Sequence, residues 1–431
     1  MKHQNWFRPA RVLVALLLVT LALPVFAGGS QEGAQPNADA VEITFGSWRV
    51  DDVDQMERLI AAFNEEHPEI AVTFDPTTPP EYNATLRLQL ESGIGPDVYY
   101  ARSYATGQEL FSDGYMLDMS GEDFVQARYD EGALAPWQMP DGTQFAMPLV
   151  AVSHGVYYNQ DIFAELDLDI PRTWDQFLSV AQAIQDAGYI PVANGLADEW
   201  DIAEVVWMNI APGFLGGRDA RLAYESGDRP FNDPAMVSVF EAMESLTPYL
   251  PDGYQAINYN DSKALFLRGE AAMWFDGSWT ISEFEASEPD FQWSVFAPPA
   301  PTAADQAITF HPDAGVAINP ASENIEEAKV FVEWLSGPTA SQILGNELAG
   351  FFPMVAEAPT LTNEHANDFL ALNQGRALDV RFPWPKLMTG DPSAYNLIQQ
   401  GSINVITGDM EPLEAADRME NGICRWYAPA M

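Results

Sequence analysis

The sequence predicts an α/β protein with more than one domain. Segments 41–45 and 70–74 are rich in β-branched and aromatic residues, and the amphipathic segment 54–67 lies between them. Together they form a strand–helix–strand unit, which is typical of a parallel sheet. The 431 residues are 47% hydrophobic and 19% charged, so there is enough apolar material for a large core. At ~150 residues per domain, we expect two or three domains.

The first helix and the elements after it carry clear sequence signals. In the helix over 54–67 the spacing i, i+3, i+4, i+7 puts four apolar residues on one face: Met56, Leu59, Ile60 and Phe63. Pro68 ends this helix, because proline lacks the amide hydrogen that a helix needs. A second helix is predicted over 82–92, closed by Gly93, and a third strand over 97–101.

Later segments repeat this pattern. The stretch 145–158 is apolar with β character and predicts a buried strand. Thr173 and Gln176 are three residues apart, the spacing of a capping box, and Asn324 and Glu327 repeat it. We therefore expect one helix to begin after Thr173 and another after Asn324.

The N-terminal residues predict export. Residues 1–27 have the layout of a cleaved secretory signal peptide: positive side chains, an apolar run over 12–23, and the small residue Ala27 before the cut. The apolar run is short for a membrane span. Residues 28–40 are rich in Gly, Ser, Gln, Ala and Asn, which predicts a flexible tether.

The charge balance excludes some partners. With 20 Lys and Arg against 63 Asp and Glu, the formal net charge is -43. This disfavours a nucleic-acid partner and an anionic membrane surface, because both need clustered cations. We interpret the acidic excess as a solvated surface that keeps the protein soluble. The single cysteine, Cys424, excludes an intramolecular disulfide.

Catalytic and cofactor signatures are missing from the sequence. It contains no Walker phosphate loop, no H-E-x-x-H pair and no G-x-S-x-G elbow. The few histidines match no metal-ligand spacing, so we expect no metal and no cofactor. Among 63 acidic residues no pair stands out as the acid and nucleophile of a glycosidase, although counting alone does not exclude one.

Aromatic residues in loop-like contexts point to a carbohydrate. The apolar faces of sugar rings stack on aromatic side chains, and their hydroxyls need planar polar partners. Trp48 and Arg49 follow the first strand, where open α/β sheets place their ligands. Further candidates of this kind are Trp200, Asp201, Asp276, Ser278, Trp279 and Trp384. Trp200 and Trp207 are seven residues apart, which predicts a shared helix face.

An ordered series of fragments resembles a known family. The most telling is Gly155–Phe163, with sequence GVYYNQDIF. The others lie at 43–48, 59–72, 92–98, 171–177, 266–273, 277–279, 313–318 and 331–335. Together they resemble the bacterial extracellular solute-binding proteins of ABC importers, the family of the maltose-binding protein. The resemblance runs from about Val41 nearly to the C-terminus.

The resemblance implies a type II periplasmic-binding-protein fold. Two discontinuous α/β lobes are joined by a hinge, and the ligand cleft lies between them. On this basis residues 41–149 and 308–354 form the N-terminal lobe, and residues 150–307 and 355–431 form the C-terminal lobe.

Further candidate ligand-binding residues follow from the same resemblance. Trp279 matches the aromatic residue that commonly stacks on the sugar, and Trp48 and Asp97 match loop positions of the first lobe. Asp97 has an alternative role as a turn cap. The remaining matches are Asp313, Trp384, and more weakly Tyr82 and Arg376.

The expected function is that of a periplasmic substrate-binding component of an ABC transporter. It would capture a mono- or oligosaccharide by hinge closure and deliver it to the permease subunits, without catalysis. We expect a monomer without a lipid anchor, because no cysteine lies at the cleavage site. Two alternatives stay open: the same fold binding a cationic solute such as a polyamine, and a secreted glycoside hydrolase.

Overall fold

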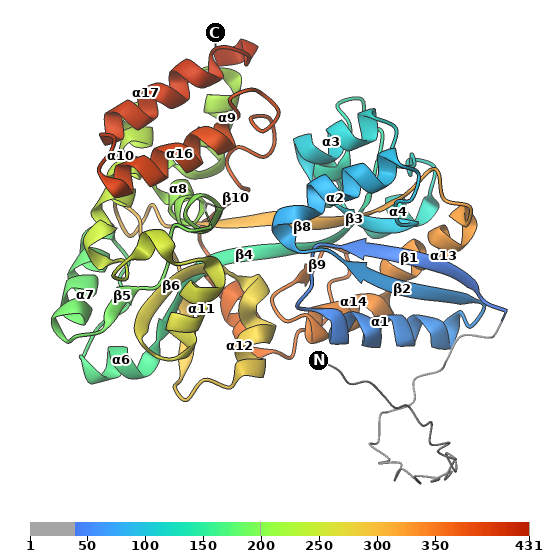
Figure 1. The fold of residues 1–431 in the computed structure, drawn as a ribbon, viewed down its shortest axis with the longest axis horizontal. Helices are drawn as coiled ribbons and strands as arrows, with labels where there is room; N and C mark the ends of the chain where they lie inside the picture. The colour runs from blue at the N-terminus through green and yellow to red at the C-terminus, as the bar shows by residue number, and fades with distance from the viewer. Residues whose placement is uncertain (1–38, 199, 431) are drawn as a thin grey trace, which may run out of the picture.

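The computed structural model describes residues 39–198 and 200–430. The predicted signal peptide and all but the last two residues of the predicted tether lie outside this range. Two α/β halves lie side by side, and the long strands β4 and β8 run from one to the other (Figure 1). In the described part of the chain, no helix combines the length and the hydropathy needed to cross a bilayer.

One mixed sheet connects the two halves. Its main path runs β2-β1-β3-β8-β4-β6-β5. The strands are β1 (Val41–Ser47), β2 (Ile70–Pro76), β3 (Val98–Ala101), β4 (Met147–Asn159), β5 (Ile190–Val192), β6 (Ala271–Gly277), β7 (Trp293–Phe296), β8 (Ala307–Ile318), β9 (Phe352–Pro353) and β10 (Ala377–Asp379). β1 pairs in parallel with β2 and β3, as the strand–helix–strand pattern predicts.

The first half packs helices around β1, β2 and β3. They are α1 (Val53–Glu66), α2 (Pro79–Glu91), α3 (Tyr104–Ser112), α4 (Asp123–Arg128), α5 (Glu131–Leu134), α13 (Ile325–Leu335) and α14 (Pro338–Glu347). The predicted apolar face of α1 is confirmed, because all four of its residues are buried. Met56, Leu59 and Phe63 belong to one cluster with strand residues such as Phe45 and later helix residues such as Phe331.

The second half contains the remaining helices. They are α6 (Gln160–Glu165), α7 (Trp174–Asp186), α8 (Met208–Leu215), α9 (Gly217–Ser226), α10 (Pro234–Ser245), α11 (Tyr259–Leu267), α12 (Ile281–Ser287), α15 (Glu364–Leu372), α16 (Ala394–Thr407) and α17 (Pro412–Ile423). A π-helical segment, η2 (Asp201–Trp207), precedes α8, and a 3₁₀ turn, η5 (Ser278–Thr280), follows β6. Two buried clusters fill this half, one on each side of its strands.

The strands β4 and β8 cross between the halves. They pair antiparallel from Met147 opposite Val316 to Ser153 opposite Phe310. Beyond this stretch β4 pairs with β6 and β7, whereas the other end of β8 pairs with β3. The short strand β9 adds a third passage beside β4. The exact lobe boundaries stay a prediction, and these passages lie close to them.

The two predicted capping boxes have different outcomes. At Thr173 the box is present, with both reciprocal hydrogen bonds to Gln176, so that prediction is confirmed. The prediction at Asn324 is wrong, because its side chain accepts no capping hydrogen bond. Its Nδ2 instead donates to the carbonyl of Glu42 at 3.1 Å, which ties the start of α13 to β1.

Candidate functional site

A cavity of about 650 Å³ lies between the two halves. This volume falls in the range of small-molecule sites, ~300–1,000 Å³. The first half contributes Trp48, Arg49, Val50, Asp51, Thr78, Pro79, Asn83, Arg102, Thr106 and Phe351, and β8 contributes Asp313. The second half contributes Asp198, Trp200, Glu204, Tyr259, Asn260, Lys263, Trp279, Thr280, Glu283, Arg381, Trp384, Met388 and Tyr395. We call this cavity the cleft.

Strand ends determine which side chains reach the cleft. Trp48 and Arg49 directly follow β1, and Arg102 directly follows β3. The carboxyl ends of these parallel strands meet at one edge of the sheet, where α/β folds bind their ligands. In the second half, Trp279 follows β6 in the same way.

Trp48 and Arg102 form one stacked unit in the first half. Trp48 is only 4% exposed and packs edge-on against Tyr82 and Tyr100. The guanidinium of Arg102 lies 3.7 Å from the centre of the Trp48 ring, a cation–π contact. Arg102 also lies 4.0 Å from Asp313, and it donates no hydrogen bond to any described residue. Its N–H groups are therefore available to a ligand.

Arg49 is neutralised by a close carboxylate. Its Nε and Nη2 donate to the two carboxylate oxygens of Asp52 at 2.5 and 2.9 Å. The same Nη2 lies 3.5 Å from the backbone oxygen of Trp279, across the cleft. Arg49 thus connects the first half to the strongest aromatic candidate of the second half.

Three aromatic side chains form a wall in the second half. The indole Nε1 of Trp279 donates to the hydroxyl of Tyr259 at 3.0 Å, and the rings of Tyr259 and Trp200 lie 4.5 Å apart. Trp279 packs against the buried clusters of both halves. We call Trp200, Tyr259 and Trp279 the aromatic wall.

Polar groups surround Trp384, and one of them, Arg381, also lies 5.8 Å from the centre of the Trp279 ring. The guanidinium of Arg381 lies 4.4 Å from the Trp384 ring and pairs with Glu204 at 2.7 Å. His311 packs edge-on against the same ring. Within the described residues, Trp384 Nε1 and Arg381 Nε have no hydrogen-bond partner. Both atoms are buried, so neither is exposed to the cleft in this structure.

Asp313 remains ionised at neutral pH. Burial by itself would raise the pKa of its carboxyl. The contact with His311 and the charges of Arg102 and Arg381 outweigh burial and lower the pKa to about 2. Asp313 is therefore a hydrogen-bond acceptor in the cleft at any pH where the protein works.

Half of the twelve predicted site residues line the cleft: Trp48, Arg49, Trp200, Trp279, Asp313 and Trp384. The other six do not line it: Tyr82, Asp97, Asp201, Asp276, Ser278 and Arg376. Ligand binding by the first group stays a prediction. The positions of the second group have identifiable physical reasons.

Asp97 lies at the wrong end of its strand. It precedes β3, so it sits at the edge of the sheet opposite the cleft. Its carboxylate accepts hydrogen bonds from the backbone and hydroxyl of Thr44 and from the hydroxyl of Ser322. The role of Asp97 is structural, but these bonds join it to β1 and to a distant loop and do not form the turn cap that the sequence alternative expected.

Tyr82 and Arg376 are occupied by backbone contacts. Tyr82 is 3% exposed, supports Trp48 from behind and donates to the carbonyl of Tyr100. Arg376 donates to the carbonyl of Leu372, at the end of α15. Neither side chain points its polar group into the cleft.

Asp201, Asp276 and Ser278 are fully buried behind the aromatic wall. Burial raises the pKa of Asp201 to about 7, against hydrogen bonds that include one from Asn194. Burial also raises the pKa of Asp276 above its usual range. Ser278 donates to the carbonyl of Gly350 at 2.5 Å and accepts from the backbone N–H of Ser153, so it ties the turn after β6 to β4 and to the segment before β9.

Trp200 and Trp207 do not share a face. Trp200 lines the cleft, whereas Trp207 is fully buried against Phe240 and Phe382. The segment between them is π-helical, with i→i+5 hydrogen bonding in place of the α-helical i→i+4. The wider turn shifts the phase, so the prediction from α-helical spacing is wrong.

The cations of the cleft are paired within the protein, whereas the lining carboxylates of Asp51 and Asp198 form no ion pair with a described residue. The lining cations are Arg49, Arg102, Lys263 and Arg381. Lys263 pairs with Glu283 at 2.5 Å, and the arginines pair with acidic residues as described above. Among the described residues, no group of three or more His, Cys, Asp or Glu could hold a metal ion.

Comparison with known families shows what kind of protein has this cleft. The family described as bacterial extracellular solute-binding protein matches residues 48–342, more than half of the chain. The chain belongs to this family. The resemblance inferred from the sequence fragments is therefore confirmed.

Individual relatives of this solute-binding protein match most of its length. The multiple sugar-binding protein of Streptococcus mutans is 24% identical over 346 residues, 78% of this chain and 80% of the relative. The sn-glycerol-3-phosphate-binding periplasmic protein UgpB of Brucella abortus is 23% identical over 406 residues, 87% of this chain and 89% of the relative.

A solved structure supports the fold. The solute-binding protein RafE in complex with raffinose has a TM-score of 0.76 and 22% identity, and the match covers 90% of this chain and 100% of RafE. The expected type II periplasmic-binding-protein fold is therefore confirmed.

Sequence reasoning missed several residues that line the cleft of this solute-binding protein. Arg102 follows β3 as Trp48 follows β1, so the strand-end rule could have found it. Tyr259 begins α11 and Arg381 follows β10, and no local pattern marked either of them. Their place depends on how distant segments pack.

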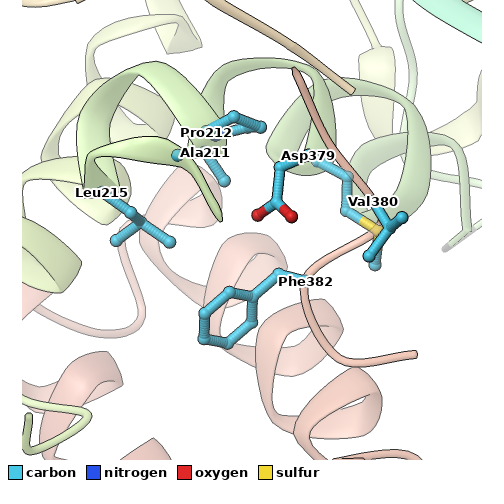
Figure 2. A pocket seen from close by; sticks show the side chains of 8 residues that line it. Ala211, Pro212, Leu215, Asp379, Val380 and Phe382 are labelled. Carbon is cyan, nitrogen blue, oxygen red and sulfur yellow. The ribbon is translucent and has the colours of Figure 1, made fainter. Parts of the chain in front are cut away.

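A second, much smaller pocket lies next to α8 (Figure 2). Its volume is about 10 Å³, room for about one water molecule and no larger ligand. Asp379 at its edge belongs to a buried network, in which Arg221 pairs with Asp379 at 2.8 Å and with Glu225 at 2.5 Å. We assign this region a structural role.

Proposed function

We propose that this protein is the substrate-binding component of an ABC transporter and captures a neutral carbohydrate in the cleft. One observation carries the proposal: aromatic rings and hydrogen-bonding groups face the same cavity, while its cations are paired with carboxylates. The aromatic wall offers surface for sugar rings. Arg102 offers donors and Asp313 offers acceptors for hydroxyls.

The pairing of the cleft cations with carboxylates favours a neutral ligand over an anion. A phosphorylated ligand such as the one in the name of UgpB needs unpaired cations to replace its hydration. Here Arg49, Arg381 and Lys263 each have a carboxylate within 2.7 Å. Arg102 is the most weakly paired, at 4.0 Å from Asp313. One such guanidinium supports hydrogen bonds to hydroxyls.

A cationic ligand is also less favoured. Cation–π recognition needs an open aromatic face. The Trp48 ring carries the guanidinium of Arg102, and the Trp384 ring carries that of Arg381. A polyamine would approach positive charge at both rings.

The glycoside hydrolase alternative is less favoured by the acidic residues with shifted pKa values. A catalytic general acid needs a raised pKa. Asp313, which lines the cleft, has its pKa lowered to about 2. Asp201 and Asp276, which have raised pKa values, do not line the cleft. We therefore propose binding without catalysis.

Hinge closure and delivery complete the proposal. The halves close on the sugar by bending at the β4 and β8 passages, and the closed form presents the sugar to the permease. We propose that the protein works as a monomer in the periplasm after cleavage behind Ala27. N-terminal sequencing of the exported protein tests the cleavage: the first residue should be Gly28.

The experiment is a thermal-shift screen followed by titration calorimetry. The panel contains raffinose, stachyose, galactose, chitin oligosaccharides, sn-glycerol-3-phosphate and spermidine. A ligand at a hundredfold excess over Kd stabilises the folded state by ~2.7 kcal/mol. Shifts confined to sugars support the proposal. A shift with spermidine or the phosphate, or release of reducing ends from an oligosaccharide, contradicts it.

A matched pair of variants localises the binding. Trp279→Ala removes part of the aromatic wall, and Trp426→Ala is the control. Trp426 is also partly buried and also donates one indole hydrogen bond, to the carbonyl of Pro392, but it does not line the cleft. Only Trp279→Ala should weaken sugar binding. Equal losses in both variants would place the sugar elsewhere.

A further inference from the structure

We propose that Asp276 is a positioning residue, which fixes the ring plane of Trp279 through the hydroxyl of Tyr259. This inference rests on the proposed function, because it treats Trp279 as a stacking surface for sugar. It concerns a side chain that is fully buried and does not line the cleft.

Three groups form a continuous hydrogen-bond chain. The indole Nε1 of Trp279 donates to Tyr259 Oη at 3.0 Å, and this hydroxyl donates to Asp276 Oδ2 at 3.0 Å. The hydroxyl of Thr280 donates to the same carboxylate oxygen, which holds it in place. Asp276 itself lies on β6, in the buried part of the sheet. The chain therefore runs from a rigid strand to the surface of the cleft.

The direction of the chain is set by its first member. An indole nitrogen is a donor only, so the Tyr259 hydroxyl must accept from it. That hydroxyl has one hydrogen, which is then free to point at Asp276. Oδ1 of Asp276 has no partner within the described residues, so a proton on the carboxyl would sit there and leave Oδ2 as an acceptor. The chain holds in either protonation state.

The same tyrosine also supports Trp200. The rings of Tyr259 and Trp200 lie 4.5 Å apart with an angle of 44° between their planes. Tyr259 thus contacts both tryptophans of the aromatic wall, one by its hydroxyl and one by its ring. Loss of the hydroxyl should release Trp279 and leave the ring contact with Trp200.

The test compares four variants of the full protein. Tyr259→Phe removes the middle link, and Asp276→Ala removes the anchor. Asp276→Asn retains one carbonyl oxygen that can accept from Tyr259. Tyr224→Phe is the matched control: it removes another tyrosine–aspartate hydrogen bond of the second half, to Asp233 at 2.7 Å, away from the cleft.

The first readout needs no ligand. Hydrogen exchange of the Trp279 indole N–H is followed by NMR, with the signal assigned from a Trp279→Phe variant. We expect exchange to be at least several-fold faster in Tyr259→Phe and Asp276→Ala, and near wild type in Asp276→Asn and Tyr224→Phe. The second readout is the affinity for the panel sugar that stabilises the wild type most. A lost hydrogen bond predicts binding about fivefold to tenfold weaker in Tyr259→Phe.

The outcomes separate this inference from the proposed function. Unchanged Trp279 exchange in Tyr259→Phe overturns the positioning role, whatever sugar binds. Exchange in the wild type as fast as in free tryptophan overturns it too. Faster exchange together with no binding of any panel sugar supports the positioning role and contradicts the proposed function. If Asp276→Ala does not fold, Tyr259→Phe still decides.

Discussion

Replacing Asp201 with asparagine is expected to change how the stability of the protein depends on pH. The Asp201 carboxylate is fully buried and accepts hydrogen bonds from Asn194, Gly195 and Ser262. Burial is the largest influence on its pKa, which rises from 3.8 to about 7. The unfolded chain does not impose this burial, so its carboxyl titrates near the lower value.

The sign follows from the protons bound in each state. Between the two pKa values, 3.8 and about 7, the folded protein keeps a proton that the unfolded chain has released. Because the folded state binds more protons, its stability falls as the pH rises through this window. At about 1.4 kcal/mol per pKa unit, the loss from this group amounts to about 4 kcal/mol. Above pH 7 the penalty is complete and constant.

Urea unfolding at pH 5, 6, 7 and 8 measures the effect. Asp201→Asn does not titrate, but its NH₂ faces donors that the carboxylate accepted, so we expect a loss of about 1–3 kcal/mol at pH 5. From pH 5 to 8 the difference should move in favour of the variant by about 3 kcal/mol. Asp228→Asn removes an exposed carboxylate and is the control. Parallel pH profiles of wild type and Asp201→Asn would refute the reasoning.

Three further predictions concern other parts of the fold. The pKa of Asp313 is about 2 in the folded protein and 3.8 for an ordinary aspartate, so this group contributes stability above pH 4 that is lost as the pH falls toward 2. Asp313→Asn should therefore make the free energy of unfolding less dependent on pH in this acid range, and an unchanged pH profile in unfolding titrations contradicts the assignment. Arg221→Met leaves the buried carboxylate of Asp379 without its cation and Glu225 with Lys386 alone, at 3.6 Å. It should lower the free energy of unfolding by about 3–5 kcal/mol in urea, and a loss below about 1 kcal/mol would show the network to be unimportant. Gly350→Ala should lower the free energy of unfolding by about 3 kcal/mol, because the residue has φ +91° and the added Cβ would lie 1.8 Å from the carbonyl oxygen of Ser278. A melting temperature equal to that of the wild type would contradict this packing.

Local sequence patterns predicted the helices and strands better than they predicted which residues line the cleft. The amphipathic face of α1 and the capping box at Thr173 depend on neighbours in the sequence, and both are confirmed. The predicted cap at Asn324 is wrong, because the side chain of this residue instead donates a hydrogen bond to the carbonyl of Glu42, on a strand distant in sequence. Sequence spacing contains no information about such a competitor.

The residues of the cleft also divide into those that a sequence rule can find and those that depend on tertiary packing. Trp48 and Arg102 lie in the cleft because each follows a parallel strand, which a sequence rule can capture. Asp97 precedes a strand and lies at the opposite edge, so the same rule would have excluded it. Arg381 and Trp384 come from one segment far along the chain that packs back onto the cleft, and such packing requires the tertiary structure.

The antiparallel pairing of β3 with β8 has a consequence for how the chain folds. Tyr99 pairs with Ala317, over 200 residues later along the chain. The sheet of the first half therefore stays incomplete until nearly three quarters of the chain is available. Contacts between residues so distant in sequence carry a large loop-closure cost and slow folding. Folding of the first half therefore waits for a segment that comes from the last third of the chain.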